Sequence, residues 1–165
     1  MPKYSAKNKR IIVVDLDGTL ISKDSSFSLF QRLLLRNPLR GARAIWNYCA
    51  YGEAYAKEYA QLHTPHAAYQ HIINKKLISY LKQEKKDGAT LILATGANID
   101  TAYAFNKQYK LFDRAIGSDS QVNCIGIHKL NAINKFYKDF MYIGDHWYDT
   151  PIWLAAKKIG VVKPN

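Results

Sequence analysis

The stretch Ile11-Ile12-Val13-Val14-Asp15-Leu16-Asp17-Gly18-Thr19-Leu20 decides the fold. Its first four residues are β-branched and apolar, which predicts a short strand buried on both faces. Side chains alternate along extended backbone, so Asp15 and Asp17 are expected to project to the same side. Gly18 then allows a sharp turn. Ligands of open α/β sheets bind at the carboxyl ends of strands, and we therefore expect this acidic pair to lie at the centre of an active site.

Length and charge limit the kinds of protein that the sequence can encode. A chain of 165 residues forms one domain, or one domain with a modest insertion. The formal net charge of +11 predicts attraction to phosphorylated substrates, nucleic acid or anionic membranes. Two cysteines, Cys49 and Cys124, are typical of reduced thiols in a cytoplasmic protein. No apolar run is long enough to span a bilayer, so we expect a soluble chain.

Helical and strand patterns alternate through the rest of the chain. Such alternation predicts an α/β fold with a doubly wound, Rossmann-like parallel sheet covered on both faces. Asn37-Pro38 and Pro65 are expected to break helices, and Asp87-Gly88 to end one. The predicted strands cover 11–14, 90–94, 114–117, 140–143 and 159–162, and the predicted helices cover 28–35, 39–60, 71–86 and 99–109, with further helices within 126–137 and from Thr150-Pro151.

Polar residues follow three of the predicted strands, and a parallel sheet would gather those strand ends along one edge. The set combines carboxylates, a hydroxyl next to backbone N–H groups, and an ammonium, which together suit phosphoryl transfer. Oxygen ligands of this kind select a hard cation such as Mg²⁺. The residues are Asp15, Asp17, Thr95, Gly96, Lys129, Asp145 and Asp149.

The order of these residues resembles the four motifs of the haloacid dehalogenase-like (HAD) phosphohydrolases. The first motif is Asp-Leu-Asp-Gly-Thr-Leu from Asp15, the second Ala94-Thr95-Gly96, the third contains Lys129, and the fourth is Gly-Asp-His-Trp-Tyr-Asp from Gly144. The resemblance covers the chain from Ile11 to about Val162. It implies a single HAD-like domain with a core over about 9–20 and 68–165. A small helical cap would be inserted after the first strand, over about 21–67.

The resemblance also implies a role for each matching residue. Asp15 would be the nucleophile that forms an aspartyl-phosphate, and Asp17 would protonate the leaving group and then activate water. Thr95 and Gly96 would hold phosphoryl oxygens, and Lys129 would neutralise charge on Asp15 and on the phosphoryl group. Magnesium would be held by Asp15, Asp145 and the backbone carbonyl of Asp17, with support from Asp149.

A narrower resemblance is to the HAD domains attached to membrane polyprenyltransferases of the 4-hydroxybenzoate type. In those domains a Pro-Ile/Val-Trp follows the last aspartate, as Pro151-Ile152-Trp153 does here. This chain ends at Asn165 without a membrane domain. We expect a phosphorylated small molecule, or a lipid or polyprenyl-linked phosphate, as substrate, because a small cap leaves room for bulky groups. The resemblance also implies peripheral contact with an anionic membrane or with a membrane prenyltransferase.

The segment from Gln31 to Tyr59 combines arginines with Trp and Tyr, and two interpretations remain open. The aromatics either pack inward in a cap with solvated arginines, or they meet an anionic lipid surface. Two other classes of protein compete with a phosphatase. A signalling receiver domain fails, because its phosphoacceptor follows the third strand, which here ends in Gly117-Ser118. A non-catalytic basic module that binds anionic membrane or, less favoured, nucleic acid is the alternative.

Overall fold

The computed structural model describes residues 10–22, 24–64 and 73–162. Its centre is a five-stranded sheet in the order β3-β2-β1-β4-β5, in which every neighbouring pair is parallel. This confirms the predicted doubly wound α/β sheet, with the strand of the opening acidic motif in the middle. The strands are β1 (Ile11–Val14), β2 (Thr90–Asn98), β3 (Arg114–Ser118), β4 (Met141–Gly144) and β5 (Lys158–Val161).

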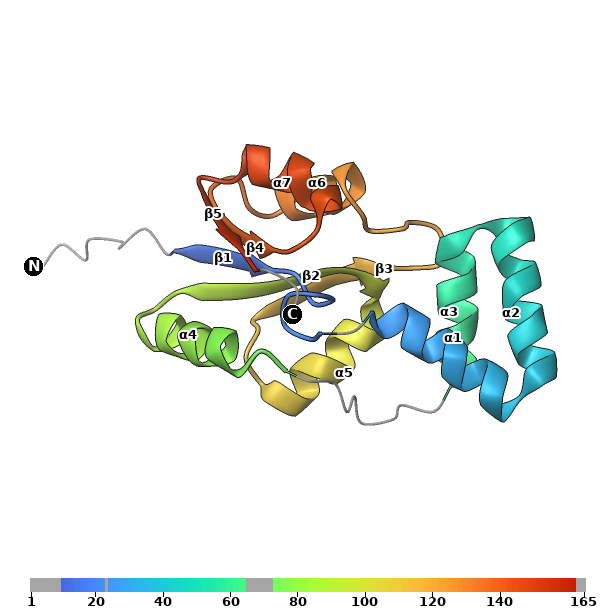
Figure 1. The fold of residues 1–165 in the computed structure, drawn as a ribbon. Helices are drawn as coiled ribbons and strands as arrows, with labels where there is room; N and C mark the ends of the chain where they lie inside the picture. The colour runs from blue at the N-terminus through green and yellow to red at the C-terminus, as the bar shows by residue number, and fades with distance from the viewer. Residues whose placement is uncertain (1–9, 23, 65–72, 163–165) are drawn as a thin grey trace, which may run out of the picture.

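Alternating side chains of the central strands supply two separate cores, one on each face of the sheet. Ile12 and Val14 of β1 pack with one cluster, together with Leu91 of β2. Val13 and Ile92 pack into the other cluster on the opposite face. Figure 1 shows α4 and α5 covering one face and α6 and α7 covering the other. β1 is thus buried from both sides, as its unbroken apolar sequence predicts.

The helices agree with most of the predicted positions. Asp24 caps α1 by accepting a hydrogen bond from the Phe27 N–H, and Asn37 both ends α1 and caps α2. Pro38 stands at the start of α2, where its missing N–H costs nothing. The helices are α1 (Ser25–Arg36), α2 (Pro38–Tyr51), α3 (Glu53–His63), α4 (Lys75–Lys86), α5 (Ile99–Tyr109), α6 (Ile127–Asn134) and α7 (Thr150–Ala155), with a 3₁₀ turn, η1 (Trp147–Asp149), before the last.

The prediction of one helix over 39–60 is wrong. Gly52 adopts a φ of 89°, which ends α2 and starts α3, so the chain doubles back after Tyr51. A left-handed φ is readily available to glycine and ends a helix without a side-chain penalty. A Gly in a polar, aromatic helical pattern gave no separate signal for this turn.

Two other predicted boundaries also differ. The helix predicted over 71–86 starts at Lys75, because Asn74 caps it through the Leu77 N–H and Ile73 forms a β-bridge to Ile21. Residues 71 and 72, and the break predicted at Pro65, lie outside the described residues. The second strand was predicted to end at Ala94, but β2 continues to Asn98, with an irregularity in its pairing to β3.

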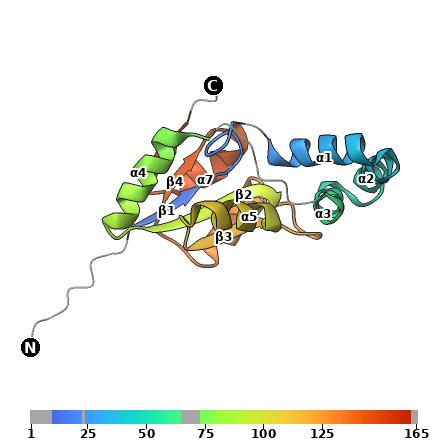
Figure 2. The ribbon, with the colours of Figure 1, turned by 90° about the horizontal axis from the view of Figure 1, so that it is seen from below.

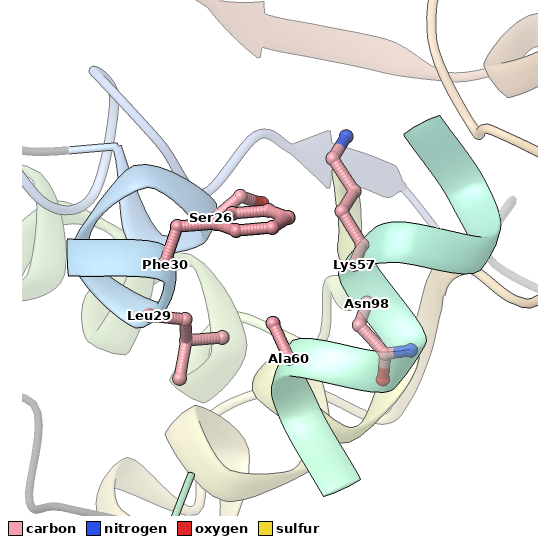
Figure 3. Close-up of a pocket in the computed structure, with 6 residues that line it drawn as sticks. All are labelled: Ser26, Leu29, Phe30, Lys57, Ala60 and Asn98. Carbon is pink, nitrogen blue, oxygen red and sulfur yellow. The ribbon is translucent and has the colours of Figure 1, made fainter. Parts of the chain in front are cut away.

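Helices α1, α2 and α3 form a group beside the end of the sheet, as Figures 1 and 2 show from two directions. Their own small core contains Leu33, Ala44 and Ala60. A small pocket between α1 and α3 is lined by Leu29 and Phe30 on one side and by Ala60 on the other (Figure 3). This group falls in the predicted cap segment, 21–67, whose division from the core stays a prediction.

Among residues 10–22, 24–64 and 73–162, no helix combines the length and the apolar character needed to cross a lipid bilayer.

Candidate active site

The loop after β1 brings its two aspartates to the edge of the sheet. The Asp15 N–H continues the ladder of β1 by donating to the Ile143 carbonyl at 2.9 Å. Gly18, with a φ of 75°, then turns the chain, and a Cβ at this position would collide with the Asp145 carboxylate. The glycine of the first motif is therefore needed twice, for its backbone conformation and for the close approach of Asp145.

Lys129 joins the ends of β1 and β4 inside the protein. It is on α6, and its ammonium donates to Asp15 Oδ1 at 2.8 Å and to Asp149 Oδ1 at 3.0 Å. It also donates to the Tyr142 hydroxyl at 3.2 Å. Lys129, Asp15 and Asp149 are all buried. A buried ion pair of this kind is a weak source of stability but holds its members in one arrangement.

Three carboxylates lie close enough to hold a cation. One oxygen each from Asp15, Asp145 and Asp149 falls within 4.8 Å of the others. The Thr19 hydroxyl donates to Asp145 Oδ1 at 2.9 Å and so orients that group. Within the described residues, the buried Asp149 Oδ2 has no hydrogen-bond partner, a costly state for a carboxylate oxygen. This donor set, hard oxygens only and one of them without a partner, fits a divalent cation such as Mg²⁺.

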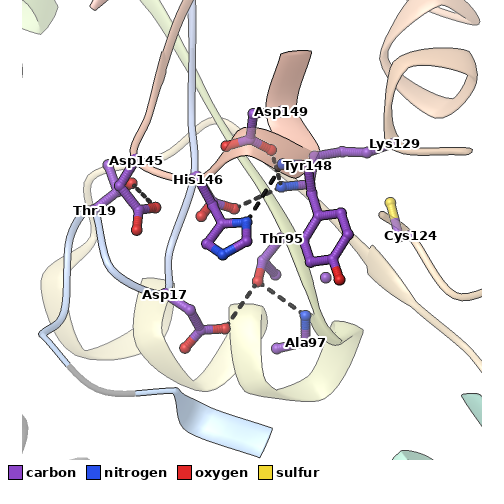
Figure 4. A network of polar contacts seen from close by, with 12 residues as sticks. Asp17, Thr19, Thr95, Ala97, Cys124, Lys129, Asp145, His146, Tyr148 and Asp149 are labelled. Carbon is purple, nitrogen blue, oxygen red and sulfur yellow. Dashed lines mark hydrogen bonds and ion pairs between the residues drawn. The ribbon is translucent and has the colours of Figure 1, made fainter. Parts of the chain in front are cut away.

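Asp17 lies outside this cluster and has its own hydrogen-bond partners. Its Oδ1 accepts from the Ser25 N–H at 2.7 Å and its Oδ2 from the Ser25 hydroxyl at 3.1 Å, at the start of α1. The Thr95 hydroxyl lies 3.4 Å from Asp17 Oδ2 and accepts from the Ala97 N–H at 3.0 Å, as Figure 4 shows. Thr95, a predicted phosphate ligand, is fully buried in β2, while Gly96 lines the open cleft.

Burial shapes the electrostatics of the acids. Desolvation raises the pKa of Asp15 to about 7, with Asp149 adding to the effect and Lys129 opposing it. Desolvation and Asp24 raise the pKa of Asp17 to about 6, against the hydrogen bonds from Ser25. The pKa of Asp145 is also raised by burial. The acids thus repel one another at neutral pH, which favours uptake of a cation or of protons.

The ammonium at the centre responds in the opposite way. Burial alone would lower the pKa of Lys129, but Asp15 and Asp149 outweigh it and raise that pKa above its usual range. Burial and the same two acids also raise the pKa of Tyr142, so its phenol stays neutral. Lys129 is therefore a permanent positive charge beside Asp15.

A second buried lysine was not predicted from the sequence. Lys57 of α3 donates to the Gly96 carbonyl at 2.9 Å and to Asn123 Oδ1 at 3.1 Å, and pairs with Glu53 at 2.7 Å. Ser118 also donates to the Gly96 carbonyl, at 2.7 Å. The network ties α3 to the end of β2 next to the cleft. Lys57 and Glu53 have the i, i+4 spacing of an ordinary surface pair, so the sequence offered no distinguishing signal.

The acids open into a cleft of about 940 Å³ between the sheet edge and helices α1–α3. Asp15, Asp17, Lys129, Asp145 and Asp149 all line it. On the helix side its walls include Phe27, Phe30, Tyr48, Glu53 and Lys57. Across from them stand His128, His146 and Tyr148, of which the last two rings stack at a centroid distance of 4.7 Å.

No protein-family model matches the sequence. The chain is 28% identical over 148 residues to an uncharacterized protein, y4nM, of Sinorhizobium fredii. The match covers 88% of this chain but 28% of that protein, so the chain spans little more than a quarter of its relative's length.

Solved structures give a clearer similarity. A Bordetella pertussis protein of unknown function superposes with a TM-score of 0.69 at 14% identity, over 92% of this chain and 88% of its own. A substrate-bound phosphoserine phosphatase superposes with a TM-score of 0.59 at 12% identity, over 96% of this chain and 89% of its own. A HAD-superfamily hydrolase from Ehrlichia chaffeensis superposes with a TM-score of 0.55 at 18% identity, over 94% of this chain and 92% of its own. The fold is that of the HAD-superfamily hydrolases.

On this HAD-like fold, the four motifs come together from distant parts of the chain. Lys129 meets Asp15 across 114 positions, and Thr19 meets Asp145 across 126. Asp17 and Thr95 are 78 positions apart. The shared edge of the parallel sheet, not proximity in sequence, assembles the site.

Proposed function

We propose that the chain is a Mg²⁺-dependent phosphatase that hydrolyses a phosphate monoester through an aspartyl-phosphate on Asp15. The observation that carries the proposal is the group of Asp15, Asp145 and Asp149, of which Asp15 and Asp149 are buried against Lys129, open to a cleft of about 940 Å³. The phosphatases among the structures of similar fold support the reaction class.

The metal would be held by Asp15, Asp145 and Asp149, with the Asp17 carbonyl as a further ligand. The orphaned Asp149 Oδ2 and the mutual repulsion of the acids support this assignment. When bound, Mg²⁺ would neutralise charge on the phosphoryl oxygens. The residues of the chain carry out the remaining chemistry.

In the first step, an Asp15 carboxylate oxygen attacks phosphorus, and the bond from phosphorus to the ester oxygen breaks. Asp17 gives its proton to that oxygen, so the alcohol leaves neutral. The pKa of about 6 suits this role, because part of the Asp17 population is protonated near neutral pH. Lys129, 2.8 Å from Asp15, orients the nucleophile and offsets the charge that arrives with the phosphoryl group.

In the second step, ionised Asp17 takes a proton from water as the water oxygen attacks phosphorus. The phosphorus–Asp15 bond breaks, inorganic phosphate leaves, and both carboxyl groups return to their first states. Ser25, which donates a hydrogen bond to each oxygen of Asp17, holds that carboxyl group in one orientation through both steps. Gly96 supplies backbone at the cleft wall where phosphoryl oxygens would bind.

The substrate that we propose carries a bulky apolar group, and a lipid or polyprenyl-linked phosphate is the candidate. Phe27, Phe30 and Tyr48 give the helix side of the cleft an apolar wall. The ammonium and carboxylate of Lys57 and Glu53 pair with each other and with Asn123. The resemblance to polyprenyltransferase-attached domains supports the same choice, and with it a membrane prenyltransferase as a partner.

Turnover of phosphate esters tests the proposal. A panel of aryl phosphate, phosphoserine and farnesyl phosphate is hydrolysed with Mg²⁺ and with EDTA, alongside Asp15→Asn. We expect Mg²⁺-dependent release of phosphate, preference for the apolar esters, and loss of turnover by at least about 10³-fold in the variant. Asp139→Asn, an exposed carboxylate paired with Lys157, is the matched control and should keep full activity.

Equal turnover by Asp15→Asn and the parent would show that Asp15 is not the nucleophile. A complete lack of Mg²⁺-dependent turnover on every ester would rule out the phosphatase and favour the non-catalytic basic module. Preference for phosphoserine over farnesyl phosphate would leave the reaction in place and reject the lipid substrate.

A further inference from the structure

The outward face of α2 is apolar, the reverse of a normal surface helix. Gly41, Ala44 and Asn47 form its buried stripe against the neighbouring helices. The opposite, exposed face carries Leu39, Ala42, Ile45, Trp46, Cys49 and Ala50, and we call these six residues the α2 face. Surface helices ordinarily place charged residues there.

The exposure of the α2 face is large for apolar side chains. Leu39 is 84% exposed and Trp46 is 60% exposed. Leu35, at the end of α1, extends the apolar surface and is also largely exposed. Isolated exposed apolar residues are normal, but a continuous apolar stripe on one helix marks an interaction surface.

Positive charge accompanies the α2 face. Arg36, Arg40 and Arg43 are exposed on α1 and α2, and Arg32 is half-buried beside them. From residue 25 to residue 52 the sequence holds these four arginines and no acid. The surface therefore combines a bare apolar stripe, a tryptophan and a cationic border.

We propose that the α2 face docks onto an anionic lipid bilayer, with α2 lying in the plane of the interface. Interfacial helices have this composition: Trp and Leu enter the acyl boundary, and arginines at the border contact lipid phosphates. The placement is suitable, because α2 lies on the side of its helix group away from the sheet in Figures 1 and 2.

A second copy of the chain suits this surface less well. A two-fold interface places the same patch against itself, which would bring the arginine borders of two copies together. Like charges facing each other across an interface cost several kcal/mol. An anionic lipid surface offers the opposite charge along the whole border.

Helix α2 carries both the docking surface and part of the cleft wall. Phe27 of α1 and Tyr48 of α2 are exposed and line the cleft. A bilayer against the α2 face would thus stand close to the cleft wall, although the docking itself requires no turnover.

Vesicle flotation of the whole chain tests the proposal. The vesicles are pure phosphatidylcholine, and phosphatidylcholine with phosphatidylserine at a 3:1 ratio. We expect binding to the anionic vesicles that weakens as salt is raised. Leu39→Ser and Trp46→Ser should each weaken it about tenfold, as the loss of one buried apolar side chain predicts. Each of Arg36→Gln, Arg40→Gln and Arg43→Gln should weaken it roughly fivefold.

The chain offers a matched control. Leu154 on α7 is 83% exposed, almost the same as Leu39, and belongs to the helices over one face of the sheet, apart from the α1–α3 group (Figure 1). Leu154→Ser should bind like the parent, and circular dichroism checks that each variant is folded. Equal binding by Leu39→Ser and the parent would overturn the proposal, as would binding to neutral vesicles as strong as to anionic ones. A dimer that Leu39→Ser dissolves, without vesicle binding, would also overturn it.

Discussion

At the scale of single residues, the distribution of charge around Lys129 decides how the site behaves. Asp15, Asp145 and Asp149 crowd one side of the cleft, and Asp17 lies nearby with its own hydrogen bonds. Burial raises the pKa values of Asp15 and Asp17, so the folded chain holds these acids at a cost near neutral pH. Both a cation and a proton relieve that cost.

Removing the central ammonium should be strongly destabilising. Lys129→Met leaves Asp15 and Asp149 buried without their partner, and we expect a loss of about 3–5 kcal/mol in the free energy of unfolding at pH 7.5. The loss should shrink at pH 5, where Asp15, whose pKa burial raises to about 7, takes up a proton instead. Chemical denaturation in EDTA at the two pH values measures it. Lys157→Met, which breaks an exposed pair with Asp139 at 2.9 Å, should cost less than about 1 kcal/mol. Equal losses in the two variants would contradict this prediction.

Asp17 should make stability depend on pH. Its pKa is about 6 in the folded chain and near 3.8 in the unfolded chain, so the folded chain binds more protons between these values. The stability linked to Asp17 is fully present below pH 3.8 and is lost as the pH rises through 6. In EDTA, the parent should therefore lose on the order of 1 kcal/mol relative to Asp17→Asn between pH 4.5 and pH 8. Thermal unfolding of both proteins across that range tests it, and a constant difference would contradict it.

At the scale of elements, glycines decide how close the helices and loops can approach. Gly41 in α2 lies against Leu34 of α1, where an added Cβ would come within 2.8 Å of the Leu34 Cα. Gly52 has open space around it but needs its φ of 89°. Gly41 is therefore required for close helix packing, and Gly52 is required for its backbone conformation.

Two substitutions separate these requirements. Gly41→Ala gains helix propensity of about 1 kcal/mol, but it must push α1 away, and we expect a net loss of about 1–3 kcal/mol. In Gly52→Ala the added Cβ meets no atom of the described chain within 4 Å, and we expect a loss of about 1 kcal/mol from the backbone alone. Urea denaturation provides both values. A more stable Gly41→Ala protein would show that α1 and α2 are not packed as described.

The elements also show what sequence patterns can and cannot predict. β1 was predictable because a run of four β-branched residues between polar ends is typical of a buried strand. The turn at Gly52 was not, because the Ala- and Tyr-rich composition of a helix continues on both sides of it. The start of α4 was displaced because Ile73 satisfies the apolar pattern of a helix while pairing with Ile21 in a bridge.

At the scale of the whole molecule, the site depends on the cation that it is proposed to hold. Mg²⁺ should stabilise the folded chain, because the acidic group forms only there; at a concentration 100-fold above its dissociation constant the gain is about 2.7 kcal/mol. Asp145→Asn should lose most of this gain, and Asp139→Asn should keep it. Thermal unfolding with Mg²⁺ and with EDTA measures the effect without any substrate. An equal gain in Asp145→Asn and the parent would contradict the assigned ligands.

The sequence predicts which residues lie at the edge of the sheet better than it predicts the contacts between the sheet and helices α1–α3. Alternating strands and helices predict a parallel sheet, and a parallel sheet brings Asp15, Lys129 and Asp145 to one edge. Lys57 was missed because its partners, Gly96 and Asn123, become neighbours only when α3 packs against β2. The apolar α2 face was visible as composition, but the structure shows which side of the helix is covered.

The strand order has a consequence for how the chain reaches its final form. β1 is made first, yet it lies between β2 and β4, so its second edge has no partner until residue 143 has been synthesised. Closing so long a loop is entropically slow, and slow parallel pairing is typical of proteins rich in distant contacts. Until then, one edge of this apolar strand has no hydrogen-bonding partner. Such an unpaired edge promotes aggregation and binding by chaperones. The pairing of β1 with β4 also brings Asp145 beside the acids that follow β1.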